Sequence, residues 1–135
     1  MPLFEWTEKL DVNVQSFNDQ HRRLVDLINH LHTAMSEGKG HATMAHVLGE
    51  LANYTMTHFA AEEKLMAEKA YPGMAAHVAE HKAFVAKVED LMSRFEKGAV
   101  ALSIETSNFL KDWLVNHIQG TDKQYGPFFN GVGVH

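Results

Sequence analysis

The sequence predicts an all-α fold: an antiparallel, up-down-up-down four-helix bundle with an N-terminal arm and a short C-terminal tail. Apolar residues recur at helical spacing in four segments, whereas the alternating patterns typical of strands are nearly absent. The loops between the segments are short, as expected for helices that pack as antiparallel neighbours. With 135 residues the chain is long enough to bury one core, so we expect a single domain over residues 1–135.

Helix-ending residues follow each of the four periodic segments. We expect helices at about residues 19–37, 42–70, 74–97 and 103–119. Asn18 or Asp19 is the expected N-cap of the first helix, because either side chain can accept a hydrogen bond from a free backbone N–H. Glycine, or proline with glycine, then interrupts the pattern at Gly38 and Gly40, at Tyr71-Pro72-Gly73, at Gly98 and at Gly120. Residues 2–17 form the arm, and residues 125–135 form the tail.

Composition excludes several classes of function. The chain has 17 acidic and 12 basic residues and no basic run, so we expect no nucleic-acid partner. It contains no cysteine, which excludes disulfides, thiolate metal sites and cysteine nucleophiles. No apolar stretch approaches the roughly 20 residues that a membrane span needs, and the N-terminus lacks the features of a signal peptide. We therefore expect a cytoplasmic protein, and a monomer.

The ten histidines are the unusual feature of the composition, and several of them lie on faces that should be apolar. A lone histidine there is usually a hydrogen-bonded core residue, and a single His-x-x-x-Glu pair is usually a surface pair. Here every expected helix contributes: His21, then His58 with Glu62, then His77 with His81, then His117. Burying these groups without partners would cost several kcal/mol, whereas a metal would satisfy all of them.

The heights of these residues in the bundle agree with one another. In an antiparallel hairpin, residues equally distant from the loop lie at the same level. His21 and His58 are equally distant from the first loop. The pair His58/Glu62 and the pair His77/His81 are at nearly equal distances from the second loop, at Tyr71-Pro72. His117 misses the same level by about one helical turn. Chance histidines have no reason to gather in one slab of the bundle.

One further carboxylate, Asp122, follows His117 by five residues. On a continuing helix this spacing would point the two side chains roughly 140° apart. Because Gly120 can end the helix between them, we expect Asp122 to fold back towards the same site.

The complete pattern resembles the ligand set of the hemerythrin family. The residues that carry the resemblance are His21, His58-x-x-x-Glu62, His77-x-x-x-His81 and His117-x-x-x-x-Asp122. Three further features are similar: Asp19-x-His21-Arg22, Trp113-Leu114-x-Asn116-His117, and Tyr125 after Asp122. The similarity spans nearly the whole chain, and it is strongest to the bacterial single-domain members.

The resemblance implies two Fe ions, cycling between Fe(II) and Fe(III) and joined by a bridging hydroxide or oxo group. Glu62 and Asp122 would each bridge both ions. His77, His81 and His117 would complete one ion, and His21 and His58 the other, which keeps one position open for O2. The implied function is reversible O2 binding for transport, storage or delivery to an unidentified acceptor, without enzymatic activity. An apolar O2 pocket is expected beside the ligands, formed by Leu24, Phe59, Trp113, Leu114 and Ile118.

Three alternatives remain open from the sequence. A di-iron oxidase of the ferritin-like class would use more carboxylates and a Glu-x-x-His motif, which is absent at this level of the bundle. An O2 or redox sensor could use the same site, although no output domain follows it in this sequence. A purely structural or zinc site would need no open position. The remaining histidines are not expected to bind the metals: His30, His32, His41, His46 and His135.

Overall fold

The computed structural model describes residues 4–38, 41–97 and 104–135, and every regular element within these ranges is a helix. Four helices are long: α1 (Gln15–Ser36), α2 (His41–Glu68), α3 (Met74–Glu96) and α4 (Ile104–Gly120). Three elements are short: the 3-10 helices η1 (Glu8–Leu10) and η2 (Asp122–Gln124), and the helix α5 (Tyr125–Gly131).

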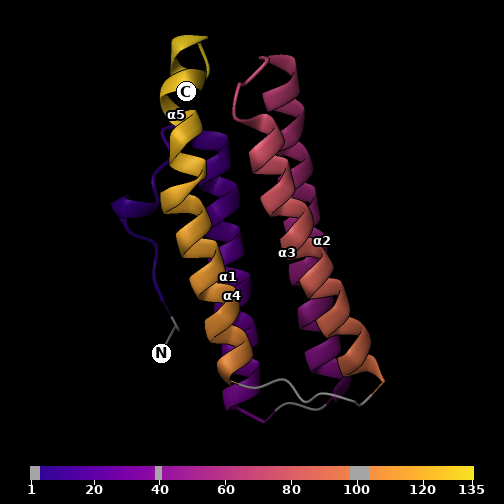
Figure 1. Cartoon of the computed structure of the whole chain (residues 1–135). Helices are drawn as coiled ribbons and strands as arrows, with labels where there is room; N and C mark the ends of the chain where they lie inside the picture. Colours follow the sequence, from indigo (N-terminus) through magenta and orange to yellow (C-terminus); the bar gives the residue numbers. More distant parts are fainter. Residues whose placement is uncertain (1–3, 39–40, 98–103) are drawn as a thin grey trace.

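The four long helices form a bundle in which consecutive helices run in opposite directions (Figure 1). Helix α1 packs against both α2 and α4, and α2 packs against α3. The predicted all-α four-helix architecture is therefore confirmed, and the expected helix ranges differ from the observed ones by at most a few residues at each end.

The start of α1 differs from the prediction. Its N-cap is Val14, which makes no side-chain capping bond, and Asn18 lies one turn inside the helix. The Asn18 side chain instead holds the arm: its Oδ1 accepts from the Val12 N–H at 3.0 Å, and its Nδ2 donates to Asp11 at 2.8 Å. The expected capping residue thus binds one backbone N–H and one side chain of the preceding arm, because the arm folds back over it.

The ends of the helices use the predicted glycines only in part. Gly38 takes a left-handed conformation after α1 (φ 68°), which glycine adopts without steric cost. After α2 the left-handed residue is Ala70 (φ 55°), and the Tyr71 N–H reaches back to the Met66 carbonyl at 2.9 Å. Helix α4 does end at Gly120, but the chain stays in right-handed geometry at Thr121. Gly40 and Gly98 lie outside the described residues.

The C-terminal segment, expected as a short tail, contains α5. This helix packs against the arm so closely that a Cβ on Gly126 would lie 2.5 Å from the Val12 carbonyl oxygen. The buried side chains of Tyr125 and Phe129 extend the core at this end of the bundle. Among the described helices, none combines the length and the hydropathy required to cross a membrane.

Candidate metal centre

The structure brings together all seven polar residues that the sequence singled out. They come from α1, α2, α3, α4 and η2, and each is at most 3% exposed: His21, His58, Glu62, His77, His81, His117 and Asp122. Asp122 reaches the site because α4 ends at Gly120 and η2 begins two residues later. The change from α-helix to 3-10 helix therefore supplies the fold-back that a continuous helix would not.

The seven residues form two groups that share their carboxylates. In each group the candidate ligand atoms all lie within 4.8 Å of one another. The three-histidine group contains Glu62, His77, His81, His117 and Asp122, and the two-histidine group contains His21, His58, Glu62 and Asp122. Two metal ions could thus be held side by side with both carboxylates between them.

Asp122 lies between the two groups, with one oxygen facing each. Its Oδ1 is 2.8 Å from His77 Nε2 and 3.0 Å from His117 Nε2, whereas its Oδ2 is 3.1 Å from His21 Nε2. A carboxylate in this position can bridge two metal ions.

Glu62 makes a similar connection from α2. Its Oε1 is 3.2 Å from His81 Nε2 and 3.5 Å from His58 Nε2, and its Oε2 is 3.6 Å from His21 Nε2. The same Oε2 accepts a hydrogen bond from the Tyr125 hydroxyl at 2.5 Å.

These nitrogens and oxygens approach one another without hydrogen-bond geometry. The Nε2 atoms of His21, His77, His81 and His117 are buried with no hydrogen-bond partner, as are Glu62 Oε1 and both oxygens of Asp122. Such burial costs several kcal/mol when nothing compensates it. The atoms converge on common points between the helices, so the donor set fits metal ions, and a mixture of imidazole and carboxylate suits iron.

The electrostatics of the metal-free site follow from the same crowding. Burial alone would lower the pKa of His21, but the adjacent carboxylates of Asp122 and Glu62 outweigh it and raise that pKa to about 9. The pKa of His77 is raised to about 9 by the same balance. For His58 burial prevails and lowers the pKa to about 4. The surrounding histidines overcome burial at Glu62 and Asp122 and lower the pKa of both carboxyl groups.

Three of the histidines have an oxygen acceptor at their second ring nitrogen. His58 Nδ1 lies 2.5 Å from the Gln20 side-chain oxygen, His81 Nδ1 lies 2.9 Å from a Glu63 oxygen, and His117 Nδ1 lies 3.0 Å from a Glu80 oxygen. With the oxygen accepting, Nδ1 carries the proton and Nε2 is free for a metal. Sequence reasoning missed Gln20, Glu63 and Glu80, which resemble ordinary surface residues.

Tyr125, quoted above only for its similarity, contacts the site directly. It is fully buried, donates to Glu62 and stacks parallel to the His77 ring at a centroid distance of 5.6 Å. Burial and the negative charge of Glu62 raise the pKa of Tyr125 well above its usual value. The hydroxyl therefore keeps its proton and donates a hydrogen bond to the carboxylate.

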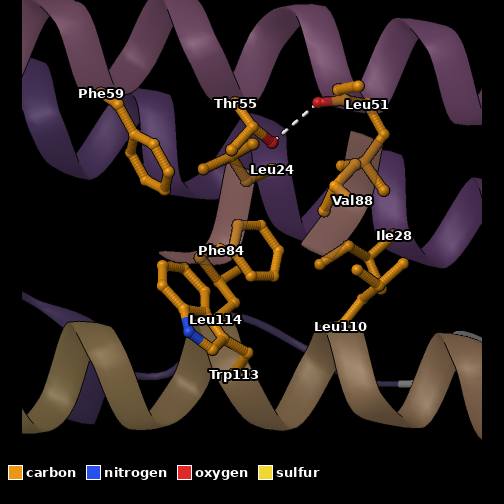
Figure 2. A pocket seen from close by; sticks show the side chains of 11 residues that line it. Leu24, Ile28, Leu51, Thr55, Phe59, Phe84, Val88, Leu110, Trp113 and Leu114 are labelled. Atoms are coloured by element: carbon orange, nitrogen blue, oxygen red, sulfur yellow. Dashed lines mark hydrogen bonds between the residues drawn. The ribbon is translucent and has the colours of Figure 1, made fainter. Parts of the chain in front are cut away.

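An apolar cavity lies between the helices (Figure 2), and it adjoins the site because two of its lining residues, Phe59 and Trp113, stack on histidines of the site. Its volume is about 20 Å³, which exceeds the roughly 10–15 Å³ that one water-sized molecule needs. Of the five residues expected to form an O2 pocket, four line it: Leu24, Phe59, Trp113 and Leu114. Ile118 is fully buried but does not line this cavity. Further lining comes from Ile28, Leu51, Ala52, Thr55, Phe84, Val88 and Leu110.

Aromatic rings join the cavity wall to the histidines. Phe59 stacks on His81 at a centroid distance of 3.7 Å, and Trp113 stacks on His117 at 4.5 Å. Thr55 adds a hydroxyl to the lining, but it donates to the Leu51 carbonyl at 2.7 Å (Figure 2). The space beside the ligands therefore has an apolar surface.

The histidines that were not expected to act as ligands lie away from the site. His30, His46 and His135 are exposed, and His46 is paired with Glu50 at 2.8 Å. His32 Nδ1 lies 3.3 Å from Ser107 Oγ. The side chain of His41 lies outside the described residues.

The fold and the site together define a metal-binding helical bundle with a histidine-rich centre. The family model described as "Hemerythrin HHE cation binding domain" matches residues 12–129. A bacteriohemerythrin from Stenotrophomonas maltophilia is 39% identical over 93% of this chain and 80% of its own length. A bacteriohemerythrin from Methylococcus capsulatus is 38% identical over 94% and 97%, and a myohemerythrin from Riftia pachyptila is 31% identical over 90% of each chain.

Solved structures are similar over the same length. The crystal structure of a wild-type hemerythrin superposes with a TM-score of 0.90, at 38% identity and over 93% of this chain and 96% of that one. A second solved structure, in which phenylalanine replaces a leucine, superposes with a TM-score of 0.91 over 94% of this chain and 97% of that one. The chain therefore belongs to the hemerythrin family.

Proposed function

We propose that this protein binds O2 reversibly at a di-iron centre and serves as a cytoplasmic O2 carrier or store. Membership of a family whose members typically bind O2 at such a centre supports the general function. The finer assignment to a carrier depends on the residues of this chain.

The observation that carries the proposal is the unequal division of histidines around two shared carboxylates. Glu62 and Asp122 would bridge both ions, with three imidazoles for one ion and two for the other. Iron bound by nitrogen and oxygen donors commonly takes six ligands. With a bridging hydroxide or oxo group as one further ligand of each ion, the ion in the three-histidine group would have six ligands and the ion in the two-histidine group five. The two-histidine group would then have the one open position, at which O2 could bind.

Two iron ions held there would supply the electrons for reversible binding of O2. The protein supplies the surroundings. Tyr125 donates to Glu62 Oε2, which lies near His21, and so holds the orientation of this carboxylate. Leu114, Phe59 and Trp113 provide the apolar wall that limits access of water and protons. Slower access of protons would prolong the life of the O2-bound protein.

The donor set favours a carrier over an oxidase. Ferritin-like di-iron enzymes use about four carboxylates with two histidines, whereas this site offers two carboxylates and five histidines. Histidine-rich ligation favours a stable Fe(II) resting state, which a reversible carrier needs. A sensor could share the same site, and it would differ in passing the signal to a partner protein.

Optical absorption during a cycle of oxygenation tests this proposal. The protein is loaded with Fe(II) without oxygen, exposed to air and then evacuated. We expect a coloured band that appears with O2, disappears on evacuation and returns over several cycles. Loss of the band after one exposure, or consumption of O2 in turnover with an added reductant, would instead indicate an oxidase.

A further inference from the structure

Two partly exposed carboxylates contact histidines of the three-histidine group. Glu63 accepts from His81 Nδ1 at 2.9 Å, and Glu80 accepts from His117 Nδ1 at 3.0 Å. Their side chains are 32% and 46% exposed, whereas both histidine side chains are only 2% exposed. Each carboxylate therefore connects the buried site with the surface of the bundle.

Glu80 is held in place from a second side. The Thr121 hydroxyl lies 2.9 and 3.0 Å from the two Glu80 oxygens. Thr121 directly precedes Asp122, so one carboxylate on α3 fixes both the His117 ring and the turn that delivers a bridging ligand. Helices α3 and α4 also contact each other through the rings of Phe84 and Trp113, which stack at a centroid distance of 3.8 Å, so this polar connection adds to an aromatic one.

Among the residues that the structure describes, none places a comparable charge behind the rings of the two-histidine group. His58 Nδ1 contacts the neutral amide oxygen of Gln20, and His21 Nδ1 is buried without a hydrogen-bond partner. A charged acceptor binds an N–H roughly twice as strongly as a neutral one. The outer contacts are thus divided: two carboxylates support one metal position, and one amide supports the other.

We propose that Glu63 and Glu80 are positioning residues that make the three-histidine group the tighter metal position, so that it fills first. A carboxylate that accepts from Nδ1 fixes the ring tautomer and orientation and raises the basicity of Nε2 towards the metal. Gln20 fixes the orientation of His58 but adds no negative charge. This inference rests on the two metal positions assigned under the proposed function, and it adds an order of loading that ligand identity alone does not provide.

Stepwise titration with Co(II), without oxygen and with a competing chelator, measures the two dissociation constants without any O2 chemistry. The variants are Glu63→Gln, Glu80→Gln and the double variant, because glutamine keeps the shape and an oxygen acceptor but removes the charge. The matched control is Glu50→Gln, since Glu50 pairs with the exposed His46, which is not a ligand. A His58→Ala variant identifies the steps, because it removes a ligand of the two-histidine group only.

We expect each single variant to weaken the tighter step by roughly 10- to 100-fold, the range found when such outer contacts are removed. The weaker step and the control should change little. The reciprocal variant Gln20→Glu should strengthen the weaker step and narrow the gap between the two. A general loss of structure would weaken both steps together, so this pattern distinguishes a positioning effect from misfolding.

An unchanged tighter step in the folded double variant would overturn the inference, and so would an unchanged weaker step in Gln20→Glu. The result for Gln20→Glu remains available if the variants of Glu63 and Glu80 fail to fold. Binding of fewer than two Co(II) ions by the unmodified protein would instead contradict the two-metal assignment itself. Failure of the inference and failure of the proposed function are therefore separate results.

Discussion

The hydrogen bond from Tyr125 to Glu62 offers a sharp test of how the site is held together. The hydroxyl and the accepting Oε2 are 2.5 Å apart, and both side chains are fully buried. The variant Tyr125→Phe removes one oxygen and its proton and keeps the ring that stacks on His77. The change therefore isolates one hydrogen bond to a buried carboxylate.

The expected loss follows from the charge and the burial. A hydrogen bond to a charged group contributes about 1.5–3 kcal/mol, and a buried acceptor left without its donor adds to the cost. With an unfolding entropy of about 2.1 cal/mol/K for each residue, a chain of 135 residues should lose roughly 5–10 °C in Tm. The metal-free protein should show this loss most clearly, because no metal then compensates Glu62.

Thermal and urea unfolding of the metal-free protein measure the difference. The control is Tyr54→Phe, which removes a hydroxyl from a surface groove between α1 and α2. We expect the control to change the unfolding free energy by less than about 0.5 kcal/mol, as is usual at the surface. If Tyr125→Phe were as stable as the control, the bond would not support Glu62 and the reasoning would be wrong.

Three further predictions concern the pocket, the turns and the dependence on pH. Leu114→Ala enlarges the apolar cavity beside His117, so the unfolding free energy should fall by about 2–5 kcal/mol. The O2-bound form should also decay faster, and an unchanged decay rate of its absorption band would contradict the role of the cavity wall in limiting access of water and protons. Ala70→Gly should raise the unfolding free energy by up to about 1 kcal/mol, because glycine removes the cost of a left-handed alanine (φ 55°). Gly38→Ala should lower the unfolding free energy by a similar amount, and a change of the same sign for both variants in urea unfolding would refute this. In the metal-free protein, protonated His21 and His77 favour the folded state because their pKa rises from 6.5 to about 9. Their contribution is complete below about pH 6.5 and is lost as the pH rises through 9, so stability should fall across that range; stability that rises there would contradict the assigned charges.

The sequence predicted the features of this protein that depend on periodicity. The apolar spacing located all four long helices, and the shared height of the histidines brought residues from different helices to one level. The return of Asp122 was also expected, because Gly120 marked the end of α4. These features depend on spacing along one helix or across one loop, and such spacing can be read directly from the chain.

Features that depend on tertiary packing were missed. Asn18 looked like a helix cap, but the arm folds back and takes its hydrogen bonds. The hydroxyl of Tyr125 meets a carboxylate 63 positions away in the sequence. Glu63 and Glu80 were not singled out from the sequence, because the rings that they contact belong to other helices. Ile118 was expected in the pocket wall but does not line the cavity. The direction of its side chain depends on the rotation of α4 about its own axis.

The central claim is that two metal positions share Glu62 and Asp122, and the iron content of purified variants tests it most directly. After anaerobic loading with Fe(II) and removal of free metal, we expect about two irons per chain in the unmodified protein. His58→Ala should retain about one, because the three-histidine group stays intact, whereas Glu62→Ala should lose most of both. One iron in the unmodified protein, or two retained in Glu62→Ala, would contradict the claim.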